Sequence, residues 1–126
     1  MINPLILDVG SGNILSLKNI ILKKTSKICI SCLEEDIKNS THIFLPGVGS
    51  FSAVMKKFKK KINTEFLKKH ILERKVFLLG ICVGMQIMCD EGDENGLQKG
   101  LSWINGKVEK IPTKEILPHV GWNSID

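Results

Sequence analysis

The chain has 126 residues, 43% of them apolar and 25% charged, which is enough for one domain with a buried core and too apolar for intrinsic disorder. Its net charge of +5 comes with no Tyr and a single Arg, so the chain is not expected to recognise nucleic-acid bases. The longest apolar run, residues 76–85, is too short for a membrane span, which needs roughly 20 residues.

Short apolar runs and segments with helical periodicity alternate along most of the chain. In chain order they predict a strand at 4–9, a helix at about 13–24, strands at 27–32 and 41–45, a helix beginning after Ser50, a helix at 64–74, a strand at 76–79 and a helix to about residue 90. Continuously apolar strands separated by helices are typical of a parallel sheet covered on both faces. The predicted fold is therefore α/β.

The net positive charge is concentrated on the predicted helix that follows Ser50. Phe51, Met55 and Phe58 recur at spacings of three and four, so they lie on one helix face, and most of the lysines at 56–61 lie on the other. This pattern favours a solvated lysine face. Binding of phosphate or of an acidic partner is the less favoured alternative.

The pattern changes after residue 90. Residues 91–99 are acidic and contain Gly, which predicts a loop. Asn105-Gly106 stands between apolar runs at 101–104 and 107–111, a signal for a β-hairpin with a type I′ turn.

The most specific chemical feature is Cys82, which follows the apolar strand at 76–79 and precedes a predicted helix. Gly80 and Gly84 flank it at two residues on either side, which is the Cys version of the nucleophile elbow. The helix N-terminus favours the thiolate, and the N–H of Val83 can stabilise an oxyanion. On this segment alone, a buried Cys that packs behind a tight turn is an equally good interpretation.

A second glycine-rich loop, at 46–51, also follows a predicted parallel strand. It should therefore emerge at the same carboxyl edge of the sheet as Cys82. Gly47, Val48 and Gly49 are the candidates to supply a second oxyanion N–H, because the glycines let the backbone turn inward. Gln86 lies one helical turn after Cys82 and is a candidate to bind the polar end of a small substrate.

Together these segments resemble the class I, or triad, glutamine amidotransferases. More narrowly, they are similar to the glutaminase subunits of imidazole glycerol phosphate synthases, in four segments found in that family's order: Asp-Val-Gly-Ser-Gly-Asn at 8–13, Pro-Gly-Val-Gly-Ser-Phe at 46–51, Leu-Gly-Ile-Cys-Val-Gly-Met-Gln at 79–86 and Pro-His-Val-Gly-Trp-Asn at 118–123. The resemblance implies a three-layer, flavodoxin-like α/β fold with a parallel sheet, in which residues 1–126 form a single amidotransferase domain that is incomplete at its C-terminus.

The resemblance also implies a reaction. Cys82 would attack the side-chain amide of glutamine, with the oxyanion held by the N–H of Val83 and one from the 47–49 loop. Water would hydrolyse the resulting thioester to glutamate. The ammonia would pass to a (β/α)₈-barrel cyclase subunit that makes imidazole glycerol phosphate in histidine biosynthesis, with no cofactor.

The same resemblance implies which residues face the cyclase. These interface candidates are Asn13, Pro118, His119, Gly121 and Trp122. The alternative for these positions is a helix-capping Asn and the ordinary start of a strand.

The chain departs from the family in its triad, whose His and Glu come from a His-Pro-Glu segment beyond the Pro-His-x-Gly-Trp-Asn motif. That segment does not occur in these 126 residues. His42, His70 and His119 are expected to be structural or solvated rather than bases. We therefore expect a C-terminally truncated chain with apolar sheet surface exposed. The alternatives are a related amidotransferase subunit for another acceptor, such as a surface sugar, and a partner-binding module without turnover.

The four Cys, in a chain without an export signal, are expected to be thiols of a cytoplasmic protein. Cys29 and Cys32 form a CxxC inside a predicted strand, where positions three apart face opposite sides, so no redox or metal site is expected. Gly10-Ser11-Gly12 lacks the third Gly of a dinucleotide-binding fingerprint.

Overall fold

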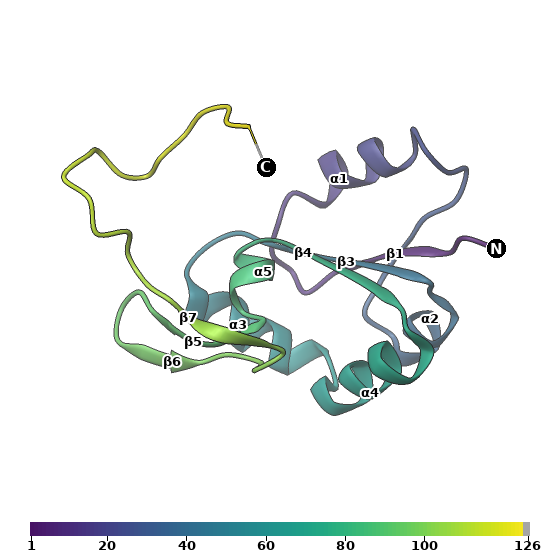
Figure 1. Cartoon of the computed structure of the whole chain (residues 1–126). Helices are drawn as coiled ribbons and strands as arrows, with labels where there is room; N and C mark the ends of the chain where they lie inside the picture. The colour runs from purple at the N-terminus through teal and green to yellow at the C-terminus, as the bar shows by residue number, and fades with distance from the viewer. Residues whose placement is uncertain (125–126) are drawn as a thin grey trace.

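A parallel sheet forms the centre of the computed structural model, which describes residues 1–124 (Figure 1). Its four strands lie in the order β2-β1-β3-β4, and all three pairings are parallel. The strands are β1 (Pro4–Leu7), β2 (Cys29–Ser31), β3 (His42–Gly47) and β4 (Phe77–Cys82). This arrangement confirms the predicted α/β class and the parallel pairing.

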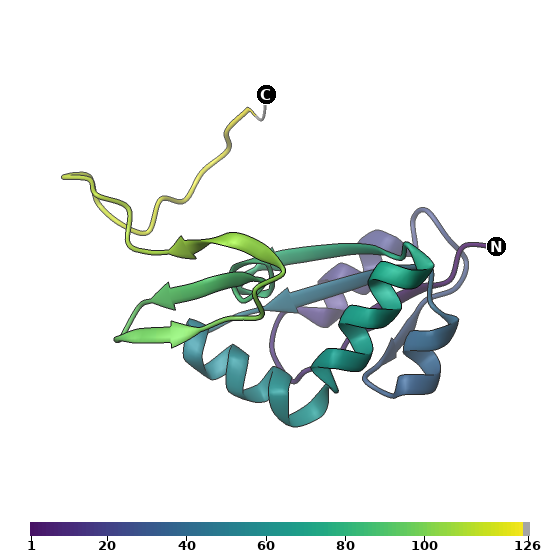
Figure 2. The same cartoon turned by 60° about the horizontal axis from the view of Figure 1, so that its bottom comes forward.

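Helices cover the two faces of the sheet unequally. Figures 1 and 2 show α1 (Ile14–Ile21) on one face and α2 (Glu34–Asn39), α3 (Phe51–Lys61) and α4 (Thr64–Arg74) on the other. The core lies mainly beneath the three-helix face, where Phe51, Phe58 and Leu67 are fully buried against the strands.

Side-chain caps set where three of the helices begin. Asn13, Ser50 and Asn63 each accept a hydrogen bond from the backbone N–H three residues further on. Helix α4 has the predicted bounds, but α1 ends at Ile21, before the predicted residue 24. Helix α2 was not expected from the sequence: it is only six residues long, and its main signal is the acidic first turn at 34–36.

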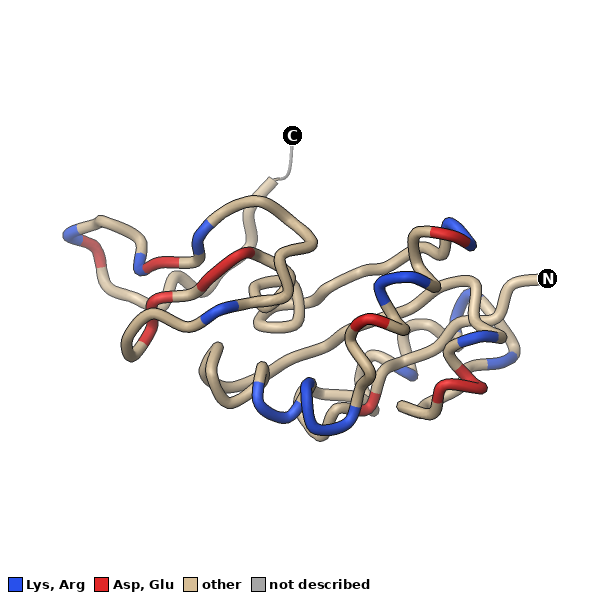
Figure 3. Tube along the Cα trace, turned by 90° about the horizontal axis from the view of Figure 1, so that it is seen from below, with Lys and Arg blue, Asp and Glu red and all other residues tan. Residues whose placement is uncertain are grey.

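The lysine face of α3 is solvated, as predicted. Phe51, Met55 and Phe58 are buried, whereas the lysines of this helix are exposed and lie at the lower edge of the molecule in Figure 3. Two of them also fasten the β1–α1 loop, because Lys57 Nζ donates to the Gly10 carbonyl at 2.8 Å and Lys61 Nζ to the Asp8 carbonyl at 3.2 Å.

The chain after Cys82 differs from the prediction. Helix α5 (Val83–Gln86) is a single turn, and the predicted helix to residue 90 and the predicted loop at 91–99 are both wrong. In their place lie β5 (Cys89–Asp93) and β6 (Leu97–Lys99), an antiparallel pair. Backbone hydrogen bonds from Leu101 to Ile87 and from Trp103 to Met88 tie the following segment to this point and leave no room for further helix.

The predicted hairpin at Asn105-Gly106 is also wrong. A single strand, β7 (Ile104–Val108), runs through this dipeptide and pairs in parallel with β5, so the second sheet has the order β6-β5-β7. The N–H of Gly106 donates to the Asp90 carboxylate at 2.9 Å, beside an irregularity in the β5–β7 register. Pairing with β5 therefore overrides the local turn tendency of Asn-Gly.

Strand β4 lies at the edge of the first sheet. Contrary to the prediction, it is not buried. Phe77 is 70% exposed and Leu79 is 55% exposed, so the prediction of helices over both faces fails here. The expected exposure of apolar sheet surface is confirmed. Among the described residues, no helix combines the length and apolar character needed to cross a membrane.

Candidate active site

Cys82 occupies a strained backbone position at the junction of β4 and α5. Its φ of 55° and ψ of −123° lie outside the regions that L-residues normally adopt. The residue is exposed, which excludes the alternative of a buried packing Cys. The turn thus presents a thiol to solvent at the carboxyl end of a parallel strand, as a nucleophile elbow does.

The two glycines around Cys82 are required by close contacts. A Cβ on Gly80 would lie 2.6 Å from Met85 Cα, and a Cβ on Gly84 would overlap the carbonyl oxygen of Leu45. Helix α5 therefore lies directly on the end of β3, and only glycine allows this approach.

The glycine-rich loop after β3 lies beside the elbow. Gly47 is the register partner of Cys82 in the β3–β4 pair, so the backbone at 47–49 continues next to the thiol. The predicted meeting of the two segments at one carboxyl edge is confirmed. Gly49 has a φ of 118°, a conformation that glycine tolerates and that lets the loop turn sharply before α3.

Ser11 holds the Val48 peptide group from the other side. The Ser11 hydroxyl donates to the Val48 carbonyl at 2.6 Å and accepts from the Val48 N–H at 2.9 Å, and Ser11 is buried. The Val48 N–H is thus occupied by Ser11 in the β1–α1 loop and is not free to bind an oxyanion, contrary to its prediction as a candidate donor. The N–H groups of Val83 and of the glycines at 47 and 49 remain the candidate oxyanion donors.

Gln86 lines a hollow of about 700 Å³ between α3, the second sheet and the C-terminal segment. Glu94, in the β5–β6 turn, lines the same hollow and accepts a hydrogen bond from the Phe51 N–H at 2.7 Å. Glu94 was not predicted from the sequence, because nothing local distinguishes one carboxylate of an acidic turn from the others. A carboxylate and an amide in one hollow can bind the charged and polar ends of a small amino acid.

The interface candidates fall into two groups. Asn13 caps α1, because its side chain accepts a hydrogen bond from the Ser16 N–H at 3.2 Å. The alternative interpretation of Asn13 as a helix cap is therefore confirmed. Pro118 and His119 lie in the C-terminal segment and line the hollow that contains Gln86, whereas Trp122 is fully exposed. Gly121, in the same segment, is exposed. Figure 1 shows this segment leaving β7 as an extended arm.

Two of the three histidines lie far from the thiol. His42 is in register with Phe77, five residues before Cys82 along β4, or roughly 17 Å away at the rise of a strand. His70 is buried in α4 near the amino edge of the sheet. The third, His119, lies in the hollow with its Nε2 2.8 Å from the Asn123 side-chain nitrogen.

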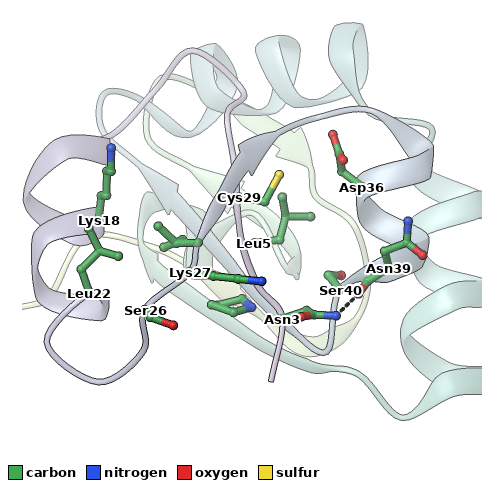
Figure 4. Close-up of a pocket in the computed structure, with 12 residues that line it drawn as sticks. Asn3, Leu5, Lys18, Leu22, Ser26, Lys27, Cys29, Asp36, Asn39 and Ser40 are labelled. Atoms are coloured by element: carbon green, nitrogen blue, oxygen red, sulfur yellow. Dashed lines mark hydrogen bonds between the residues drawn. The ribbon is translucent and has the colours of Figure 1, made fainter. Parts of the chain in front are cut away.

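A separate pocket lies at the amino edge of the sheet between α1 and α2, where Figure 4 shows Cys29 and Asp36 among its lining side chains. Partial desolvation of its sulfur and the neighbouring Asp36 carboxylate raise the pKa of the exposed Cys29 thiol, which makes it a poor nucleophile. All four Cys are free, and residues 1–124 contain no group of three His, Cys, Asp or Glu arranged to hold a metal ion.

An exposed, strained Cys at the carboxyl edge of a parallel sheet, with a glycine-rich loop beside it, defines an α/β protein with a nucleophile elbow. The family described as glutamine amidotransferase class-I matches residues 5–124. The chain belongs to this family.

Relatives in three organisms carry one name, imidazole glycerol phosphate synthase subunit HisH. The chain is 42% identical over 123 residues to the protein of Sulfurisphaera tokodaii, covering 95% of this chain and 59% of that one. It is 36% identical to the protein of Leptospira interrogans, covering 95% and 61%, and 38% identical to that of Corynebacterium glutamicum, covering 96% and 57%. The chain thus spans about three fifths of the length of the curated relatives it matches.

Proposed function

We propose that the protein is the glutaminase subunit of an imidazole glycerol phosphate synthase and acts in the cytoplasm. In this proposal residues 1–126 belong to a single amidotransferase domain. The observation that carries the proposal is the geometry of Cys82, an exposed thiol at a φ of 55° beside Gly47. The names of its relatives support the assignment to histidine biosynthesis.

The proposed reaction hydrolyses glutamine in two steps. The Cys82 sulfur adds to the side-chain amide carbon, the C–N bond breaks, and the nitrogen leaves as ammonia with the proton that the thiol gives up. Water then adds to the thioester, and the C–S bond breaks to release glutamate and the thiol. The N–H of Val83 and one from Gly47 or Gly49 stabilise the oxyanion of each step.

In this proposal the side chains that line the hollow beside α5 bind the substrate. The Gln86 amide binds the polar end of glutamine, and the Glu94 carboxylate binds its ammonium group. The position of Glu94 is held by the Phe51 N–H, so binding is linked to the start of α3.

The proposed partner is a (β/α)₈-barrel cyclase subunit that consumes the ammonia. Asn13 on the β1–α1 loop and Pro118, His119, Gly121 and Trp122 on the C-terminal segment are the proposed contacts. The full exposure of Trp122 supports this role, because a large aromatic side chain gains most by burial in an interface.

A glutamine-mimicking electrophile tests the nucleophile. We expect it to label Cys82 ahead of Cys29, Cys32 and Cys89, with free glutamine protecting the site. The Cys82→Ser variant should lose this labelling, and the matched Cys89→Ser variant should retain it. Even labelling of the four thiols, or labelling that survives Cys82→Ser, would overturn the assignment.

A further inference from the structure

A hollow of about 580 Å³ opens at the amino edge of the sheet, at the opposite end of the strands from Cys82. It lies where α2 leads into β3 and α4 leads into β4. Every titratable side chain that lines it is basic: Lys38, His42, His70, Arg74 and Lys75. Lys38, Arg74 and Lys75 carry positive charge at neutral pH, and three cations around one concave surface attract anions.

His70 is the buried member of this basic hollow. Its side chain is only 8% exposed, and its Nε2 has no hydrogen-bond partner within the described part of the chain. The ring is stacked on Phe66 at a centroid distance of 6.2 Å, which limits its reorientation. A buried polar atom without a partner is uncommon and costly, so this nitrogen points to a ligand.

The cations of the basic hollow also lack counterions. The ion pairs found among residues 1–124 join Lys69 to Glu73 and Lys107 to Asp93, and neither includes Lys38, Arg74 or Lys75. The hydroxyl groups that line the hollow already have hydrogen-bond partners within the chain. Ser40 donates to the Ile37 carbonyl at 2.7 Å, and Thr41 contacts His42 Nδ1 at 2.9 Å.

We propose that the basic hollow binds a small, multiply charged oxyanion, a phosphate group. Arg74 offers a guanidinium for two parallel hydrogen bonds to phosphate oxygens, and Lys38 and Lys75 add point charges. His70 Nε2 supplies a buried donor when the ring is protonated. Several cations in one hollow favour a dianion over a single carboxylate.

Without an anion, the surroundings of His70 favour its neutral form. Burial lowers the pKa of His70, and the Arg74 guanidinium lowers it further, while the carbonyls of Ile37 and Ser40 and the Glu73 carboxylate oppose this. Lys38 from α2 and His42 from β3 also line the hollow. A bound dianion would favour the imidazolium, so phosphate should move the pKa of His70 upward.

Titration with inorganic phosphate, followed by the imidazole resonances of the full chain at constant ionic strength, tests the proposal. We expect the signals of His70 and His42 to shift saturably and that of His119, at the other hollow, to stay fixed. Arg74→Gln should weaken binding about tenfold or more, because it removes charged hydrogen bonds. Lys75→Gly should also weaken it, and glycine suits the φ of 52° at that position.

Lys60→Gln on the exposed face of α3 is the charge-matched control and should bind phosphate as the unmodified chain does. Equal or tighter binding of glycerol 3-phosphate would identify a phosphomonoester as the ligand, and weaker binding would identify free phosphate. Either result keeps the proposal. Shifts that do not saturate, or affinity unchanged by Arg74→Gln, would overturn it.

Discussion

The backbone strain at Cys82 can be measured by comparing two small side chains at that position. A non-glycine residue at a φ of 55° and a ψ of −123° costs about 1–3 kcal/mol, and glycine removes this cost. Glycine also loses more conformational entropy on folding, which offsets about 0.5–1 kcal/mol. Cys82→Gly should therefore be more stable than Cys82→Ala, by about 0.5–2 kcal/mol.

Cys29 provides the matched control, because it is also an exposed Cys but lies in β2 with an ordinary strand conformation. There the order should reverse, and Cys29→Gly should be less stable than Cys29→Ala by about 0.5–1 kcal/mol. The difference in stability between the Gly and Ala variants should therefore have opposite signs at positions 82 and 29. Removal of a thiol in general cannot produce such a reversal.

Equilibrium unfolding in urea measures the four variants. Trp103 is a suitable fluorescent probe, because its ring packs edge-on against Phe58 in the core at 6.2 Å. A difference of 1 kcal/mol corresponds to about 3–6 °C in Tm for a domain of this size. Equal stability of Cys82→Gly and Cys82→Ala, or the order found at Cys29, would refute the claim of strain at the elbow.

Three further predictions concern Ser11 and Gly84 near the elbow and His70 at the opposite edge of the sheet. Ser11→Ala removes both hydrogen bonds to the Val48 peptide and should lower the free energy of unfolding by about 2 kcal/mol in urea, while Ser11→Thr should retain most of it. Gly84→Ala places a methyl group on the Leu45 carbonyl and should cost about 3 kcal/mol or more, seen as a lower Tm and a displaced α5. The lowered pKa of His70 means that the unfolded chain binds more protons, so stability should fall as the pH drops below about 6.5.

A specific result would contradict each of these three predictions. Ser11→Ala with unchanged urea unfolding would show that the Val48 peptide is held by other groups. A Gly84→Ala chain as stable as the unmodified one would contradict the close contact of α5 with β3. For His70, the urea midpoint should lose part of its dependence on pH in His70→Gln; the same acid slope in that variant would assign the effect to other groups.

Local patterns predicted those parts of the molecule that depend on neighbouring residues. The bounds of α4 follow from its 3.6-residue periodicity and its capping Asn63, and both are present in the structure as expected. The elbow at Cys82 was predictable for a similar reason, since two glycines within two residues of a strand end permit only a few tight turns. The β5–β7 sheet was not, because its strands are short and polar and are stabilised by pairing with one another.

The sequence by itself determined the α/β class, the parallel strands and the position of the thiol, because apolar periodicity and glycine spacing act over a few residues. Tertiary structure alone decided what surrounds that thiol. The Ser11–Val48 contact joins residues 37 positions apart, and the Glu94–Phe51 contact joins residues 43 apart. The basic hollow likewise brings α2 and α4 together. Such contacts form only when the folded sheet brings its loops to a common edge, and no local pattern encodes which side chains meet there.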